Sequence, residues 1–387
     1  MKQGWELKKL GEVVEVLDNL RKPITKKDRI EGEYPYYGAT GILSFVHNYI
    51  FSEKLVLIGE DGAKWLSGDK TSFIANGKYW VNNHAHVIRP KRNIILDEWI
   101  VYFLNFSDLT PFITGMTVPK LNQEKMRSIE LPLPPLPEQQ RIVAILDDAF
   151  AAIAKAKANA EQNLKNAKEL FESYLQGVFE NKGKDWEVKT LGEVLIKTET
   201  IDPTKKPKEE FIYLDVSSVN KETKEIENAT VLLGKDAPSR ARKLVRTNDV
   251  IFATVRPTHS RVALITEEYD EQVCSTGYFV LRAKEFLSNN LVYYFLLTYS
   301  FNKQMEKLQK GASYPAVTDS EVKGIYIPFP KSLNEQKGIV QKLDALSLEI
   351  KKLEAIYQQK INDLEELKKS VLQKAFSGEL KTEKVLV

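Results

Sequence analysis

The stretch EQQRIVAILDDAFAAIAKAKANAEQNLKNAKELFESYLQGVFE, residues 138–180, contains no proline and a single glycine, Gly177. It follows the proline-rich turn LPLPPLP at 131–137, whose prolines end the preceding element. A stretch of this length without helix breakers predicts one helix of about 43 residues, on the order of 64 Å long. Helices of a globular core are usually shorter, so we interpret this one as a spacer.

A second long helix is predicted at 335–377, after Asn334 as a favourable N-cap and with Glu335 in the first turn, where the helix dipole favours an anion. Apolar residues recur in both helices at alternating three- and four-residue steps, which indicates a coiled-coil seam. The first helix delivers the chain to the second insert and the second helix starts there, so if the helices pair, the short route is antiparallel. The expected seam positions are Leu343, Leu346, Ile350, Leu353, Tyr357, Leu364, Leu367 and Val371, interrupted at Lys360, against Leu146, Ala149, Ile153, Ala156, Ala160, Asn163, Ala167, Leu170 and Tyr174.

Both helices belong to an internal repeat. WELKKLGEV at 5–13 returns as WEVKTLGEV at 186–194, and the block that begins at Gly115 returns from Gly311. Between the repeated blocks, residues 14–114 and 195–310 show no similarity beyond generic strand and turn patterning. We interpret each half as a shared frame around an insert of its own, and an old duplication whose middle drifted is the alternative.

The bulk properties limit the class of protein. At 387 residues the chain exceeds the usual size of a single core. Its one cysteine, Cys274, allows no internal disulfide and suits a reducing compartment. The N-terminus MKQGWELKKLGEV lacks the apolar core of a signal peptide, and no apolar run is long enough to cross a bilayer. We therefore expect a cytoplasmic protein that does not enter a membrane.

The first insert, about 14–130, has the strand and turn pattern of a mixed α/β domain. Its turns carry glycines, which permit close backbone approach, and polar side chains that fit base edges. Turns that contact nothing explain this pattern equally well. The predicted DNA contacts are Tyr37, Thr40, Lys64, Trp65, Asn82, His84 and, in the repeated block, Lys120.

The second insert, about 195–326, has a clearer cationic footprint at 238–246 and 254–261. Cations interleaved with Ser, Thr and His can hold phosphates while an arginine reaches a guanine edge. A solvated basic loop is the alternative, favoured for Lys243 and Arg246. The predicted contacts are Ser239, Arg240, Arg242, Lys243, Arg256, Thr258, His259 and Arg261, with Ser313 and Tyr314 in the loop that corresponds to the one holding Lys120.

No motif supports a catalytic or metal site. The chain has no Walker A loop, no G-x-G-x-x-G, no H-E-x-x-H and no Cys-x-x-Cys pair. Glu60 and Asp61 with Lys64 lack the second acidic partner that a nuclease needs. His84 and His86 lack a third ligand, and Cys274 in a strand-like run is interpreted as a buried apolar residue. We expect neither catalytic residues nor a metal site.

The stretch LPLPPLPEQQRIV at 131–143, followed by Leu146 and Asp147, resembles the repeated region of type I restriction-modification specificity subunits. A weaker copy lies at 327–330 and 334–336. The resemblance implies two target recognition domains, each binding one half of a split site in double-stranded DNA. It also implies two methyltransferase subunits that use S-adenosylmethionine and dock on the helices, and two restriction/translocase subunits that use ATP and magnesium. The chain itself would hold no cofactor.

Together these observations predict an α+β fold: two mixed α/β target recognition domains with twisted sheets, separated by two long antiparallel coiled-coil helices with pseudo-two-fold symmetry. The predicted segments are a first recognition domain at 1–137, a first spacer helix at 138–182, a second recognition domain at 183–333, and a second helix with a C-terminal tail at 334–387. A specificity subunit of a methylation-only or other bipartite DNA-modifying system is the closest alternative. A homodimerising coiled coil, an enzyme and a protein-binding scaffold are the others.

Overall fold

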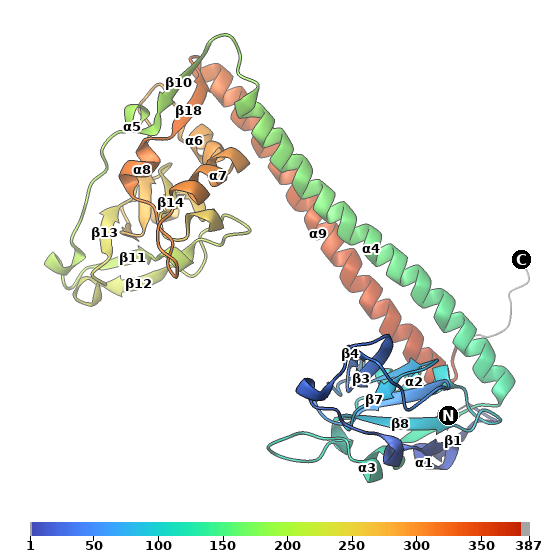
Figure 1. The fold of residues 1–387 in the computed structure, drawn as a ribbon. Coiled ribbons are helices and arrows are strands. Elements are labelled where there is room, and N and C mark those ends of the chain that lie inside the picture. Colours follow the sequence, from blue (N-terminus) through green and yellow to red (C-terminus); the bar gives the residue numbers. More distant parts are fainter. Residues whose placement is uncertain (1, 381–387) are drawn as a thin grey trace, which may run out of the picture. The chain divides into compact units, whose positions relative to one another are not determined.

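The computed structural model describes residues 2–380 and divides into two compact units. The first unit contains the residues up to Glu161 and those from Gln358 onward, and the second contains Gln162–Tyr357. Each unit consists of one α/β domain and a segment of each of two 45-residue helices, α4 (Leu136–Glu180) and α9 (Leu333–Ser377) (Figure 1). The end of the predicted tail, 381–387, lies outside the described residues.

The repeated sequence blocks form the same small frame in each unit. In the first, β1 (Glu6–Lys9) pairs antiparallel with β9 (Glu130–Leu133), and in the second β10 (Trp186–Thr190) pairs antiparallel with β18 (Tyr326–Pro330). The tryptophan of each WE motif donates its indole N–H to the glutamate of the distant EQ pair. The two distances are 3.2 Å for Trp5 to Glu138 and 3.1 Å for Trp186 to Glu335. These contacts explain why both motifs recur together.

A one-turn helix follows the first strand of each frame: α1 (Leu10–Val13) and α5 (Leu191–Val194). Each is the LGEV of the repeat, and its glutamate accepts the N–H of the residue before the helix at 2.8 Å. This contact satisfies a donor that a helix start leaves without a partner. Leucine and valine of the same motif are buried in the core.

The first insert contains two sheets. The first has the strand order β2 (Val14–Val16), β8 (Ala85–Pro90), β5 (Leu55–Gly59), β6 (Ser72–Ala75), and the second has β4 (Gly41–Val46), β3 (Tyr34–Gly38), β7 (Trp80–Val81). In the second sheet β3 and β7 run parallel. Helix α2 (Asp97–Phe106) packs Trp99 and Leu104 into the core that also receives Leu372 and Phe376 of α9. A further short helix is α3 (Gln123–Arg127).

The second insert also has two sheets. Their strand orders are β15 (Val262–Leu264), β14 (Val250–Ala253), β17 (Tyr278–Leu281), and β12 (Thr230–Leu233), β11 (Glu210–Leu214), β16 (Val273–Ser275), β13 (Ala241–Leu244). Its helices are α6 (Asn289–Leu296), α7 (Tyr299–Leu308) and α8 (Asp319–Lys323). The two inserts also contain 3₁₀ turns, among them η1 (Asp18–Leu20), η2 (Lys26–Asp28), η4 (Pro203–Lys205) and η7 (Pro257–His259).

The two inserts share their strand pairing, although their sequences differ. Gly59 lies opposite Ala85 in the first, as Ala253 lies opposite Tyr278 in the second. The parallel pairs Tyr36–Trp80 and Tyr213–Val273 correspond in the same way. The inserts are thus alike in topology although their sequences show no similarity beyond generic strand and turn patterning. A strand register needs apolar residues on the right face, and many different sequences meet that condition. Strand β13 has no named counterpart in the first insert.

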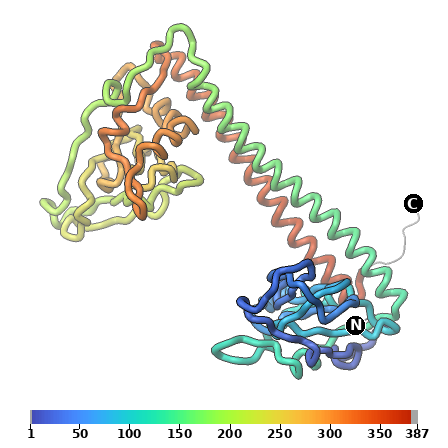
Figure 2. Tube along the Cα trace, viewed as in Figure 1, coloured from blue at the N-terminus to red at the C-terminus, as the bar shows by residue number. Residues whose placement is uncertain are grey.

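The long helices pack side by side and antiparallel in each unit (Figure 2). In the first unit Lys157 of α4 pairs with Glu365 of α9 at 2.6 Å, while Leu146, earlier in α4, shares a core with Leu372, later in α9. In the second unit the start of α9 packs on the end of α4 in the same sense. The α+β class with two paired long helices is thus confirmed.

The seam departs from its expected positions toward the end of α4, and also at Leu353 and Leu367 of α9, which are 38% and 49% exposed. Leu170 and Tyr174 are 61% and 43% exposed, and the neighbouring Phe171 and Leu175 turn inward instead. A straight α-helix has 3.6 residues per turn, so a seam extrapolated at 3.5 drifts off the contact face over several heptads. Helix α9 begins at Leu333, before the expected Asn334 cap, and Glu335 donates its N–H to the hydroxyl of Ser332 at 3.4 Å. Within residues 2–380, none of the helices is long and apolar enough to cross a membrane.

Candidate nucleic-acid interface

In the first domain, three loops distant in sequence meet where strand β5 ends. The N–H of Glu60 donates to the carbonyl of His84 at 2.9 Å, and the N–H of Leu121 donates to the carbonyl of Glu60 at 2.8 Å. Asp61 forms a bridge with Lys120. The turn after β5, the turn before β8 and the hairpin at 114–120 are therefore neighbours, and loops at strand ends are where binding residues concentrate.

The second domain joins its loops by the same bonds. The N–H of Thr254 donates to the carbonyl of Gly277 at 2.9 Å, and the N–H of Val317 donates to the carbonyl of Thr254 at 2.9 Å. The N–H of Thr276 donates to the carbonyl of Arg240 at 2.8 Å. Three segments that the sequence predicts separately as DNA contacts are thus neighbours: 238–246, 254–261 and 312–315.

Arg256 and Tyr314 make a direct contact across two of these loops. The N–H of Arg256 donates to the carbonyl of Pro315 at 2.7 Å, and its guanidinium carbon lies 5.3 Å from the centre of the Tyr314 ring. Tyr314 is 72% exposed. The amide of Asn302 holds the following turn by donating to the carbonyl of Thr258 at 3.1 Å. An exposed cation over an exposed aromatic ring suits both phosphates and base edges.

Several residues of the first domain that are predicted to contact DNA are buried or half-buried and support the loops through internal contacts. Trp65 and Asn82 are 9% and 3% exposed. The Asn82 side chain accepts the N–H of His84 at 2.8 Å, and the ring of Tyr37 packs on that of Tyr79. The exposed members of the set are Thr40, Lys64 and His84, and Lys120 is half-buried. Contact of these residues with DNA stays a prediction.

In the second domain, three of the nominated cations have internal partners. The Lys243 ammonium donates to the carbonyl of Tyr278 at 2.6 Å and to Asp319 at 2.8 Å. Arg242 lies 3.5 Å from Asp202, and Arg261 donates to the carbonyl of Val219. Ser239, Arg240, Arg256, His259 and Ser313 are exposed, and Thr258 is half-buried. DNA contact by this set also stays a prediction.

His259 lies among cations. Partial burial, together with Lys221, Arg256 and Arg261, lowers the pKa of its imidazole below the ordinary value. A neutral imidazole can both donate and accept a hydrogen bond, which suits contact with a base edge better than contact with a phosphate.

Sequence reasoning missed a pair of lysines that recurs in both inserts. Exposed Lys26 and Lys27 lie on the turn η2, and exposed Lys205 and Lys206 lie on or beside η4. The signal was present as PITKK at 23–27 and PTKK at 203–206, a short match inside the inserts. In the first domain the indole of Trp80 anchors this loop by donating to the carbonyl of Lys22 at 2.6 Å.

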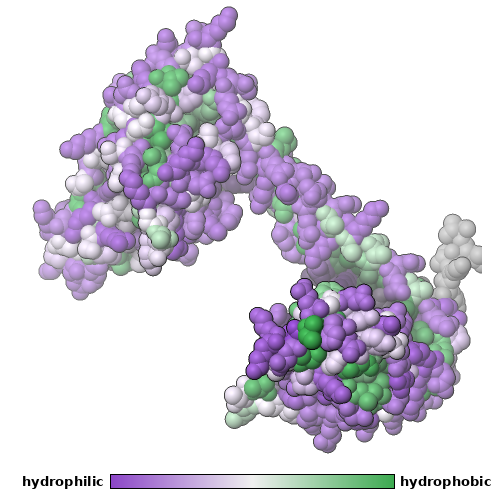
Figure 3. Space-filling model, viewed as in Figure 1, coloured by the Kyte–Doolittle hydropathy of each residue, from purple (hydrophilic) through white to green (hydrophobic). Residues whose placement is uncertain are grey.

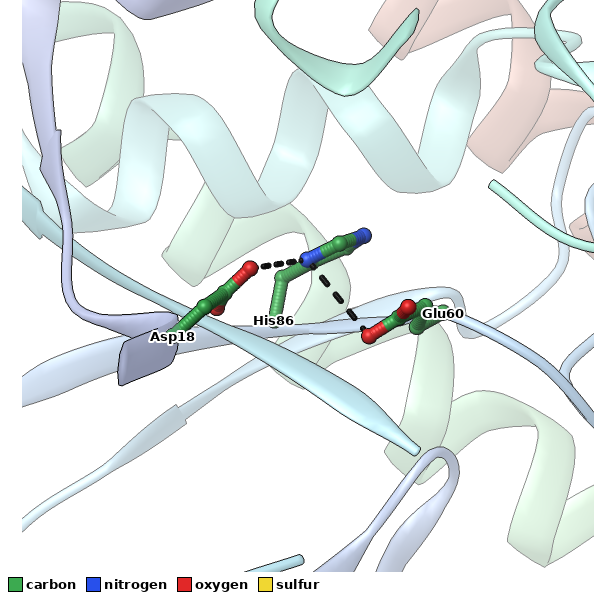
Figure 4. A group of neighbouring side chains, drawn as sticks. All are labelled: Asp18, Glu60 and His86. Carbon is green, nitrogen blue, oxygen red and sulfur yellow. Dashed lines mark hydrogen bonds and ion pairs between the residues drawn. The ribbon is translucent and has the colours of Figure 1, made fainter. Parts of the chain in front are cut away.

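Asp18, Glu60 and His86 are the candidates for a metal site, since one ligand atom from each lies within 4.8 Å of the others (Figure 4). Their ligand atoms already have partners, however. Arg21 lies 2.5 Å and Lys120 2.6 Å from the two oxygens of Glu60. A divalent cation would meet two positive charges there, so we interpret the group as an ion-pair network. His86, rather than the pair His84 and His86, brings these carboxylates together.

Cys274 lies in the core and is fully buried. Burial raises the pKa of its thiol to about 12, which keeps it protonated at neutral pH. A protonated thiol inside a sheet is a poor nucleophile, in agreement with the interpretation of Cys274 as a structural residue.

Comparison with known proteins adds the family. Residues 2–165 and 183–366 both match the model of the type I restriction modification DNA specificity domain, and the chain belongs to this family. The class function is recognition of DNA sequence. The MjaVIII type I restriction enzyme specificity subunit of Methanocaldococcus jannaschii is 25% identical, over 98% of this chain and 93% of that protein. A Haemophilus influenzae chain named as a type I specificity subunit is 38% identical, over 37% of this chain and 36% of its own length.

Solved structures share the fold. A chain from a study of complex assembly and conformational transition of the type I R-M system has a TM-score of 0.74 at 19% identity, over 98% of this chain and 99% of that one. The HsdS subunit from Thermoanaerobacter tengcongensis has a TM-score of 0.60 at 20% identity, over 98% of each chain. Both likenesses support the fold.

Proposed function

We propose that this chain is the DNA specificity subunit of a type I restriction-modification complex, and that each of its two domains binds one half of a bipartite double-stranded target. The supporting observation is that equivalent strand-end loops carry different side chains: Glu60-Asp61-Gly62 in the first domain and Thr254-Val255-Arg256 in the second. The same backbone with different donors and acceptors is what two different base sequences require.

The chain performs no chemistry in this proposal. Methyl transfer from S-adenosylmethionine belongs to two methyltransferase subunits, and ATP-driven translocation and magnesium-dependent cleavage belong to two restriction/translocase subunits. Their docking on the helices is supported by exposed apolar side chains that the helix pair leaves without a partner. These are Leu170, Leu348, Leu353, Ile356 and Leu367. Figure 3 shows hydrophobic surface interrupting the hydrophilic colour along α4 and α9.

The test is a map of N6-methyladenine in the genome of cells that express the chain with its methyltransferase. We expect one motif with two specified parts and an unspecified spacer. Exchange of residues 14–114 for the insert of another family member should change only one part, and exchange of 195–310, the matched control, only the other. A single uninterrupted motif, or a change of both parts by either exchange, would contradict the proposal.

A methylation-only system is the alternative within the same class. Challenging the cells from which the chain comes with foreign DNA that is unmethylated at the motif separates the two. Loss of that DNA indicates a full restriction system, and its survival alongside intact methylation indicates methylation alone.

A further inference from the structure

A group of buried ionisable side chains lies at the base of the first domain's hairpin, residues 114–120. The side chains of Asp18, Glu60 and His86 are between 1% and 8% exposed. His86 Nδ1 lies 2.6 Å from Asp18 and 3.8 Å from Glu60. Dashed lines in Figure 4 mark these two contacts. Charges removed from water this far are costly unless each one has a partner, so the arrangement calls for a structural reason.

His86 has an oxygen acceptor on each side of its ring. Nε2 lies 2.7 Å from the carbonyl oxygen of Leu121, which can only accept a hydrogen bond, and Nδ1 faces the carboxylate of Asp18. The ring therefore contacts Asp18 on one side and Leu121 on the other. One of its two bonds reaches the residue that directly follows the hairpin.

Lys120 connects the hairpin itself to this network. It closes the hairpin through two backbone bonds with Thr114, of 2.8 Å and 2.9 Å, and its ammonium lies 2.6 Å from Glu60. The other oxygen of Glu60 is paired with Arg21, which also donates to the carbonyl of Ala85 at 2.8 Å. The side chain of Lys120 is 42% exposed, whereas that of Glu60 is 8% exposed.

The second domain lacks the charges of Lys120 and Glu60, and the imidazole of His86, at the corresponding positions. In the second domain, strand register places Phe279 at the position of His86. The loop contacts place Thr254 at the position of Glu60 and Ala316 at the position of Lys120. The Lys120–Glu60 ion pair and its contact with His86 thus have no counterpart at these positions, which makes the second domain an internal control.

We propose that the Lys120–Glu60 ion pair, backed by Arg21, Asp18 and His86, is a positioning device: it holds the hairpin 114–120 in the one arrangement that recognises the first half-site. This rests on the proposed function. Lys120 then acts through Glu60 and makes no phosphate contact of its own. Discrimination at the first half-site therefore depends on Glu60, a residue too buried to touch DNA.

The test is a double-mutant cycle on the full chain with Lys120→Met, Glu60→Gln and both changes together. Each protein selects from a library of duplexes randomised across both half-sites. We expect each single variant to lose discrimination at the first half-site by about tenfold, and the double variant to lose no more than the larger single loss, because coupled residues are not additive. The preference at the second half-site stays unchanged.

Lys120→Arg keeps the ion pair and is expected to retain discrimination. Thr254→Val, the matched change at the position of Glu60 in the second domain, should leave the first half-site as it was. If Glu60→Gln fails to fold, Lys120→Met keeps the test, because Glu60 remains paired with Arg21. Its loss of first-half-site discrimination together with a normal unfolding midpoint supports positioning.

One specific result would overturn the positioning role of the Lys120–Glu60 ion pair. In that result Lys120→Met weakens binding to all duplexes alike and lowers the salt dependence of the binding constant by about one phosphate contact. The effect is the same in the Glu60→Gln background. Lys120 then binds a phosphate, and the positioning role is overturned. If the wild-type chain selects no two-part motif at all, the proposed function fails instead. The two failures are thus distinguishable.

Discussion

Arg256 in the second domain occupies the position that Gly62 occupies in the first. Gly62 follows Glu60 by two residues and Arg256 follows Thr254 by two, and the carbonyls of Glu60 and Thr254 accept equivalent hydrogen bonds from the segment after the hairpin. Both residues have a left-handed backbone, with φ of 50° at Arg256 and 70° at Gly62. Glycine adopts this conformation freely, whereas a residue with a Cβ pays roughly 1 kcal/mol or more for it. Non-glycine residues held in such conformations cluster at functional sites, so we infer that the second domain keeps an arginine there for binding.

Substitution of Arg256 by glycine should therefore raise the free energy of unfolding relative to alanine but lower the affinity for the second half-site. We expect Arg256→Gly to be about 1 kcal/mol more stable than Arg256→Ala, because only glycine relieves the backbone, as denaturant unfolding can measure. Both variants should weaken the second half-site by about 1 to 3 kcal/mol if the guanidinium contacts guanine. Gly62→Ala is the matched control: a Cβ there meets open space, so its expected cost of about 1 kcal/mol is conformational. Equal stability of the two Arg256 variants would remove the strain argument.

Gln139 and Gln336 make the same buried contacts at the start of the two long helices. Each amide donates to two carbonyls and accepts one backbone N–H, all between 2.8 Å and 3.0 Å, and both side chains are fully buried. Gln139→Ala leaves these groups unsatisfied and should destabilise the first unit by roughly 3 kcal/mol. Gln336→Ala should do the same to the second. Hydrogen exchange resolves which unit opens, and exposed Gln140→Ala should change neither.

Two tyrosines make the fold sensitive to alkali. Burial first, and then a hydrogen bond donated to Asp344, raises the pKa of Tyr294, and Tyr102 with Asp147 repeats this in the first unit. The neutral form is favoured in the folded state, so its stabilisation is full below the unfolded pKa of about 10 and is lost as the pH rises beyond it. Tyr294→Phe should flatten the loss of thermal stability above pH 10. An unchanged slope in Tyr102→Phe/Tyr294→Phe would show that these pairs do not contribute.

Cys274 should be inert in the native protein. Its thiol is fully buried and its pKa is raised, so it offers neither access nor thiolate. We expect no reaction with a soluble thiol reagent at neutral pH until denaturant unfolds the second unit. The same reagent on a Ser239→Cys variant, at an exposed loop position, is the positive control. Fast labelling of native wild-type protein would contradict the buried placement.

The helices should determine the spacer of the DNA target. Lys157 of α4 pairs with Glu365 of α9, so removal of 154–160 and 362–368 takes one matched heptad from each helix. Seven residues correspond to about 10 Å, or roughly three base pairs along the duplex. We expect the methylated motif to keep both parts and lose about that much spacer. A deletion in α4 alone breaks the pairing and is the control, expected to abolish methylation. An unchanged spacer after the matched deletion would exclude a ruler role.

The sequence by itself determined the frame of the molecule. The long stretches without breakers at 138–180 and 335–377 specify helices because helix formation is local and depends on neighbouring residues. The repeated WE and EQ motifs marked the contacts that bind helix to strand, since the same pair recurs in both halves. The composition of the loops indicated nucleic acid as a ligand, although not the roles of single residues.

The tertiary structure alone decided which loops meet and which of their side chains are buried or paired. The common topology of the inserts was invisible because strand pairing depends on register between distant segments. The meeting of Arg256 with Tyr314, and of Asp18 with His86 across 68 residues of sequence, depends on where strands end in space. Burial of Trp65 and the internal pairing of Lys243 follow from the same cause. Local physics fixes the helices, whereas long-range packing decides which side chains remain free to bind.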